Sequence, residues 1–192
     1  MDEQITLEGL SVRADQTGAF AVLARLLVHG LEAEETVRAL HAFTEEARQR
    51  REFPAALLAE LLRVKGHYCR GETGVAHAAG LAAATLAREI GDDLAEAHAH
   101  KWLALIAFDE GRSKDGHDHL LDALAGFETA GAPEELPTLT RWYGEHLAFL
   151  GATEEAQRAL RLARERYLDA GDLAGARALE ADIAAVALKQ GS

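Results

Sequence analysis

Four histidines that lie close together in the sequence are the residues best suited to chemistry. His98 and His100 fall in one predicted helix, and His117 and His119 open the next. Imidazole groups suit zinc, nickel and copper. However, residues two apart on a helix point to opposite sides, and we expect the starts of two antiparallel helices to lie about one helix length apart. The sequence therefore predicts no metal site. A His-rich metal-binding protein is the alternative of a different class, and it predicts bound metal that His98→Ala or His117→Ala removes.

The single cysteine is the next candidate for catalysis. Cys69 has His67 two residues before it on the same predicted helix, so the two side chains point about 200 degrees apart and the imidazole does not activate the thiol. The chain contains no phosphate-binding glycine loop, no dinucleotide fingerprint, no H-E-x-x-H and no C-x-x-C. The sequence therefore predicts a protein that is not an enzyme and that needs no cofactor.

A 40-residue repeat must position these side chains. Turn glycines recur in two columns that are 20 residues out of phase: Gly71, Gly111, Gly151 and Gly191 in one, and Gly91, Gly131 and Gly171 in the other. Each lies beside apolar-periodic stretches of about 16 residues, which is the pattern of helix, turn, helix, turn. The units are 51–90, 91–130, 131–170 and a half repeat 171–192. A degenerate copy covers about 11–50, with helices over 20–29 and 34–50, and we expect one repeat domain over 1–192.

Other columns share the same period. Hydroxyl residues two positions after the first glycine column are predicted to cap the helices that follow; they are Thr73, Ser113 and Thr153. Small residues recur at five and at twelve positions after the same glycines, and they are Ala76, Gly116 and Ala156, then Ala83, Ala123 and Ala163. Small side chains at one helical phase let two helices approach closely.

Composition agrees with an all-α chain and limits its partners. There are 40 Ala and 29 Leu residues against only 11 Val and Ile residues, so helix formers dominate. The net charge of -12 disfavours binding to nucleic acid and to an anionic membrane surface. The acidic N-terminus is unlike a signal or transit peptide, and no apolar run is long enough to span a bilayer. We therefore expect an acidic cytoplasmic protein.

The glycine and alanine columns resemble the tetratricopeptide-repeat (TPR) family. The family's small residue seven positions before the turn glycine matches Ala104 and Gly144, and its alanines five and twelve positions after it match the columns above. Two features differ: the proline that ends the family's second helix is absent, and the unit has 40 residues where the common unit has about 34. The resemblance is to the long-helix variety found in bacterial regulators. It implies a bacterial α-solenoid of antiparallel helix pairs wound into a right-handed superhelix.

The resemblance also implies a binding groove, because the first helix of each pair lines a concave surface in this family. The positions carried over include the following candidates for partner binding: Lys65, Tyr68, His98, Lys101, Phe108, Arg141, Glu145 and Phe149. Cations in such a groove would bind carboxylates of a peptide while the aromatic rings contact its apolar side chains. The alternative is that the cations only balance neighbours such as Glu145.

The function that follows is a non-catalytic scaffold that binds a protein or peptide segment in its groove. A peptide-sensing regulatory domain of a longer signalling or transcription-regulatory protein is the alternative within binding modules. Residues 173–189 are apolar for the end of a repeat array, which normally carries a polar cap. Either this last helix caps the stack alone, or a further segment of a longer protein covers it, or a second copy covers it in a homodimer. We expect one of the two covered arrangements.

Overall fold

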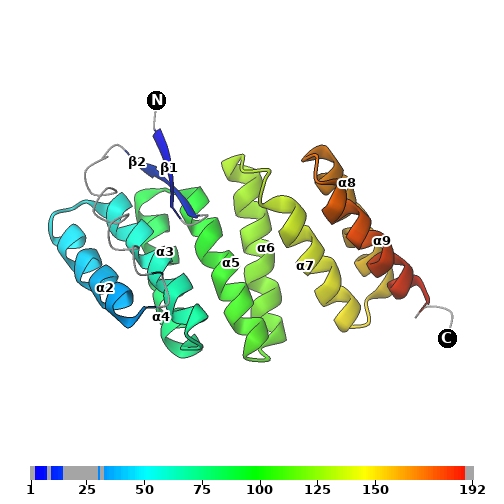
Figure 1. Ribbon diagram of the computed structural model, residues 1–192, viewed down its shortest axis with the longest axis horizontal. Coiled ribbons are helices and arrows are strands. Elements are labelled where there is room, and N and C mark those ends of the chain that lie inside the picture. Colours follow the sequence, from blue (N-terminus) through cyan, green and yellow to red (C-terminus); the bar gives the residue numbers. More distant parts are fainter. Residues whose placement is uncertain (1–2, 8–9, 15–29, 31–32, 189–192) are drawn as a thin grey trace. The chain divides into compact units, whose positions relative to one another are not determined.

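The fold is that of a computed structural model, which describes residues 3–7, 10–14, 30 and 33–188 (Figure 1). The chain divides into two compact units, unit 1 over residues 1–126 and unit 2 over residues 127–192. Unit 1 contains the strands β1 (Glu3–Leu7) and β2 (Leu10–Ala14), the helices α2 (Glu34–Gln49), α3 (Phe53–Cys69), α4 (Thr73–Ile90) and α5 (Asp93–Asp109), and most of α6 (Ser113–Ala130). Unit 2 contains the end of α6 and the helices α7 (Leu136–Phe149), α8 (Thr153–Asp169) and α9 (Leu173–Leu188). The prediction of a single repeat domain stays a prediction.

The fold is an α-solenoid of antiparallel helix pairs, as the repeat predicted. Within unit 1, α2, α3, α4 and α5 pack against one another in chain order, and within unit 2, α7, α8 and α9 do the same. The predicted helix over 34–50 is α2. The predicted helix over 20–29 lies outside the described residues. In the described part of the chain, no helix combines the length and hydropathy needed to cross a membrane.

The glycine columns form the turns because the helices end in one repeated motif. At Gly111 the backbone is left-handed with φ 72°. The next amide, that of Arg112, donates to the carbonyl of Ala107 at 2.8 Å, which is the bond of a Schellman cap. The other turn glycines of both columns within the described residues also have positive φ. Because the same turn geometry recurs at 20-residue intervals, the chain reverses direction at the same two places in each repeat.

The prediction for the helix starts was wrong at two of its three positions. Thr73 and Thr153 are the first residues of α4 and α8, and the residues before them, Glu72 and Ala152, make no side-chain cap. Side-chain caps occur instead directly after two glycines of the other column. Asp92 accepts from the amide of Ala95 at 3.0 Å, and Asp172 accepts from the amide of Gly175 at 2.8 Å.

The columns of small residues lie between helices, as predicted. The three alanines twelve positions after the first glycine column are all 0% exposed; they are Ala83, Ala123 and Ala163. Gly144 of α7 has the same role as these alanines, because it lets two helices approach closely. A Cβ added to Gly144 would lie 2.8 Å from the side chain of Leu160, so α7 and α8 pack at a distance that excludes a larger residue.

A two-stranded hairpin at the N-terminus was not predicted. β1 and β2 pair antiparallel with Ile5 opposite Val12, and β2 packs against α3 and α5. Residues 11–14, expected to open a degenerate helical repeat, therefore lie in a strand. The alternation of apolar Ile5, Leu7, Leu10 and Val12 with polar neighbours was the available signal.

Candidate functional site

The predicted groove residues of unit 1 come from α3 and α5, the first helices of two neighbouring pairs. Lys65 and Tyr68 lie on α3, and Lys101 and Phe108 lie on α5; all four side chains are half-buried. β2 packs against both of these helices, and the helices also contact each other. β2 of the chain's own hairpin therefore covers part of the surface of the two helices that were expected to bind a partner.

Tyr68 belongs to a packed contact between these helices. Its hydroxyl donates to Asp109 at 2.6 Å, and its ring centroid lies 5.5 Å from that of Trp102. Burial, followed by the hydrogen bond to the Asp109 carboxylate, raises the pKa of Tyr68 to about 12. Tyr68 therefore joins α3 to α5 in addition to presenting part of its ring to solvent.

His98 is not a groove residue. Its side chain is only 2% exposed, so it lies inside unit 1, where a partner cannot reach it. Burial, with the nearby charge of Lys101 as the second cause, lowers the pKa of His98 to about 3, which keeps the imidazole neutral. The family spacing predicted a groove position here because it gives only the side of the helix on which a residue lies. It does not say how deeply the neighbouring elements bury that residue.

Phe108 packs against the helix that follows. A Cβ added to Gly116 of α6 would lie 2.5 Å from the Phe108 ring, so the ring rests directly on the glycine. Small residues at this column were predicted to permit close helix packing, and at Gly116 the space is filled by an aromatic ring. Phe108 therefore contributes to the α5–α6 contact inside unit 1.

The remaining predicted groove residues, Arg141, Glu145 and Phe149, lie on α7 in unit 2. Arg141 donates to Glu145 at 2.6 Å, and its guanidinium also lies 3.4 Å from Asp182 of α9. The hydrogen bond to Glu145 raises the pKa of Arg141, which keeps the guanidinium charged. This geometry matches the alternative in which a groove cation balances neighbouring carboxylates.

An open pocket of about 320 Å³ lies beside this ion pair and is formed within unit 2. It is lined by residues of α7, α8 and α9, namely Glu145, Ala148, Phe149, Leu160, Asp182, Ala185 and Val186. Phe149 is 79% exposed, so most of its side chain is accessible to solvent. The pocket thus combines an apolar lining with two carboxylates and an exposed ring. Sequence reasoning found Glu145 and Phe149 and missed Asp182, because nothing in the repeat pattern indicates which residue of α9 faces α7.

The thiol and its neighbouring histidine are not paired. Cys69 is exposed, and the Nδ1 atom of His67 lies 2.7 Å from the Glu72 carboxylate. Hydrogen bonds from Arg70 and then from His67 lower the pKa of Glu72 to about 2. His67, in the last turn of α3, therefore contacts a residue of the turn that follows this helix.

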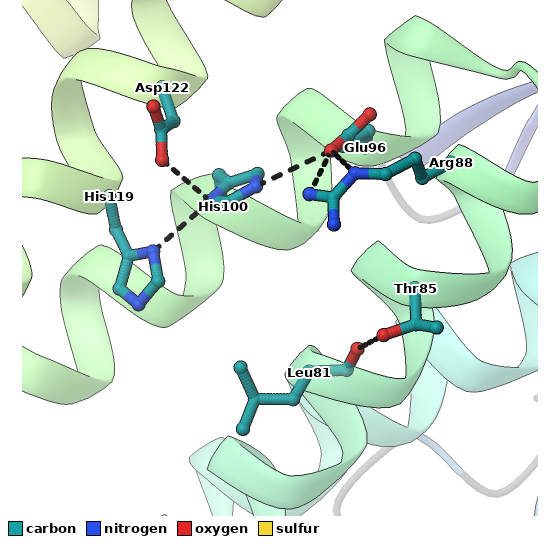
Figure 2. Close-up of polar contacts among 7 residues, drawn as sticks. All are labelled: Leu81, Thr85, Arg88, Glu96, His100, His119 and Asp122. Atoms are coloured by element: carbon teal, nitrogen blue, oxygen red, sulfur yellow. Dashed lines mark hydrogen bonds and ion pairs between the residues drawn. The ribbon is translucent and has the colours of Figure 1, made fainter.

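Two of the four clustered histidines come together, which contradicts the expected separation of about one helix length. The Nδ1 atoms of His100 and His119 lie 3.1 Å apart, and Asp122 lies 3.5 Å from the same nitrogen of His100 (Figure 2). The expectation failed because His100 lies near the middle of α5 and His119 within the second turn of α6, so antiparallel packing brings them side by side. Burial, followed by the charge of His100, lowers the pKa of His119.

Comparisons with known proteins agree on the fold. No protein-family model and no curated protein matches the chain by sequence. Among solved structures, a kinesin light chain with nearly identical TPR-like repeats from Podosopora anserina has a TM-score of 0.61 at 14% identity, covering 91% of this chain and 95% of that one. BtubC from P. vanneervenii has a TM-score of 0.55 at 13% identity, covering 91% of this chain and 89% of that one. The fold is therefore that of a TPR-like helical repeat protein, which confirms the resemblance drawn from the glycine and alanine columns.

Proposed function

We propose that the chain is a non-catalytic protein-interaction module and that the pocket of unit 2 binds a segment of a partner protein. Stacked helical repeats present extended surfaces that such proteins use for binding. The observation that carries the proposal is the apolar pocket between α7, α8 and α9 with Phe149 exposed at its edge.

The chemistry of the pocket specifies the kind of segment that fits. Leu160, Ala148 and Val186 give it an apolar lining, so it suits one aliphatic or aromatic side chain as an anchor. Phe149 offers a large ring to the same side chain, and exposed aromatic residues are frequent anchors of protein interfaces.

The charges around the pocket favour a basic neighbour next to that anchor. Glu145 and Asp182 share the single guanidinium of Arg141, so two carboxylates face one cation there. The chain as a whole carries a net charge of -12, which attracts a cationic segment during encounter. The partner segment therefore presents an apolar side chain followed or preceded by Lys or Arg.

Selection from a random peptide library displayed on phage tests this proposal without a known partner. We expect the purified chain to enrich peptides that pair an apolar anchor with a basic residue. Synthetic versions of these peptides should bind at least about tenfold more weakly to Phe149→Ala and to Glu145→Lys, since each change removes a pocket contact worth about 1.4 kcal/mol or more.

Leu162→Ala is the matched control, because Leu162 is an exposed leucine of α8 in the same unit and does not line the pocket. It should leave the affinities unchanged. Selected peptides that bind the parent, Phe149→Ala and Glu145→Lys equally well would contradict the pocket as the binding site.

Other predicted interactions remain predictions. Binding of peptide carboxylates by Lys65 and Lys101 in unit 1 is checked with Lys101→Glu, which should abolish it. A homodimer through the last helix is checked by sedimentation of the parent beside Leu173→Glu, because Leu173 of α9 is exposed. The cytoplasmic location and the peptide-sensing alternative also stay predictions.

A further inference from the structure

A cluster of potential metal ligands lies between α5 and α6, within unit 1. The ring nitrogens of His100 and His119 and a carboxylate oxygen of Asp122 all lie within 4.8 Å of one another. Figure 2 shows His119 and Asp122, both from α6, directed at the same edge of the His100 ring. Three ligand atoms of types that bind zinc therefore converge on one point from two helices.

Two of the three distances between ligand atoms are close to those of a tetrahedral metal site. Ligand atoms about 2.0–2.1 Å from a tetrahedral zinc ion lie about 3.3–3.4 Å from one another. The Nδ1 atom of His100 lies 3.1 Å from Nδ1 of His119 and 3.5 Å from the oxygen of Asp122. Asp122 is 60% exposed, so its carboxylate is able to rotate the short distance needed to complete the third edge.

A carboxylate lies near the second nitrogen of His100. Nε2 lies 3.7 Å from a carboxylate oxygen of Glu96, and two nitrogens of Arg88 donate to that same oxygen at 3.0 and 2.6 Å. A metal-ligating histidine almost always directs its other ring nitrogen at a carboxylate, a carbonyl or water, which fixes the ring orientation. The His100 side chain is only 12% exposed, so its ring is held in this orientation by its surroundings.

We propose that His100, His119 and Asp122 bind one divalent transition-metal ion of the zinc type, with Glu96 as the residue that positions His100. Two imidazoles and one carboxylate leave a fourth tetrahedral position, which is open to water beside the exposed Asp122. Because the ligands come from α5 and α6, the ion ties the two helices of one repeat together. Its binding therefore stabilises unit 1 and does not depend on the proposed partner site in unit 2.

The test measures Zn²⁺ binding to the untagged protein by competition with a chromophoric chelator. We expect one ion per chain. His119→Ala should reduce the affinity by more than the roughly 10–100-fold that loss of an outer-shell partner costs, and Glu96→Gln should reduce it within that range. Asp122→Asn serves as a second ligand variant that keeps the fold, because the side chain is exposed. Co²⁺ bound to the parent should give the visible spectrum of a tetrahedral site.

His117→Ala is the matched control, since His117 lies on the same helix and outside the cluster. It should bind Zn²⁺ like the parent, and Zn²⁺ should raise the melting temperature of the parent and of this variant but not of His119→Ala. Far-UV circular dichroism establishes that each variant is helical. Failure of the folded parent to bind Zn²⁺, or equal affinities of His119→Ala and His117→Ala, would overturn the proposal and leave the two imidazoles as a hydrogen-bonded pair.

Discussion

The hydroxyl of Tyr68 donates a hydrogen bond of 2.6 Å to Asp109, a residue 41 positions further along the chain. The two residues lie near the carboxyl ends of α3 and α5, which are the first helices of neighbouring repeats. The bond therefore connects one repeat to the next beside the apolar cluster against which the Tyr68 ring packs. Partial burial, followed by the Asp109 carboxylate, favours the protonated phenol.

This contact predicts that Tyr68 ionises at an unusually high pH. Because the pKa of Tyr68 is raised to about 12, its ionisation should follow that of an ordinary tyrosine by about two pH units. Asp109→Ala removes both the acceptor and the negative charge, so it should move the late step toward lower pH. The absorbance of tyrosinate during an alkaline titration measures this directly.

The same shift fixes the pH range over which Tyr68 contributes to stability. A pKa raised in the folded state favours the protonated form, so the contribution is complete below about pH 10 and is lost as the pH rises through about 12. Tyr68→Phe is the control, because it should delete the late step altogether. A titration of Asp109→Ala that coincides with that of the parent would show that the hydrogen bond does not exist in solution.

The left-handed backbone of Arg51 predicts that replacing this residue with glycine stabilises the fold. It has φ 61° where the neighbouring turns have glycine, and the amide of Glu52 after it donates to Ala47 in the same Schellman bond of 2.8 Å. A left-handed residue with a Cβ is strained by roughly 1–2 kcal/mol, part of which the greater freedom of unfolded glycine offsets. Arg51→Gly should therefore raise the free energy of unfolding by about 0.5–1 kcal/mol.

Gly71→Ala provides the opposite change at the next turn along the chain. Its φ is 74°, and a Cβ there would meet nothing within 4 Å, so any loss of stability arises from the backbone. We expect a loss of about 1 kcal/mol in urea unfolding. A stabilising Gly71→Ala or a destabilising Arg51→Gly would show that these turns are not under the strain argued here.

The helix caps give a second matched pair, both in unit 2. Asp172 accepts from the amide of Gly175 at 2.8 Å at the start of α9, whereas the Thr153 hydroxyl donates to the carbonyl of Gly151 at 3.3 Å and caps no helix. Asp172→Ala should cost about 1 kcal/mol of stability, and Thr153→Ala should be close to neutral. Denaturant midpoints of the two variants measure the difference, and equal midpoints would mean that the Asp172 cap contributes nothing.

The helical repeat could be predicted because a glycine column specifies a backbone conformation. Only the turn residue needs a positive φ, so Gly71, Gly111 and Gly151 marked the ends of first helices and the alanine columns marked the buried contacts. The fold class follows from these local requirements, which depend on a few residues around each turn.

The side-chain clusters could not be predicted in the same way, because they depend on which residues of separate helices lie at the same height along the packed helices. His100 and His119 meet because neither lies at a helix end. Asp182 of α9 contacts Arg141 of α7, within unit 2. His98 is buried although the family spacing placed it in the groove. The hairpin formed by β1 and β2 was missed because a faint helical repeat was expected to begin at about residue 11, inside β2.

Helix spacing itself gives the last prediction. A Cβ added to Gly126 of α6 would lie 2.8 Å from the Cβ of Ala97 and 3.4 Å from its Cα, and neither atom is the end of a flexible side chain. α5 and α6 would have to separate, so Gly126→Ala should cost about 1–3 kcal/mol even though alanine favours a helix. Gly74→Ala, near the start of α4, meets nothing within 4 Å and should be neutral or stabilising by up to about 1 kcal/mol. If chemical denaturation found both variants equally stable, the close approach of α5 and α6 would be refuted, and with it the short distance between His100 and His119.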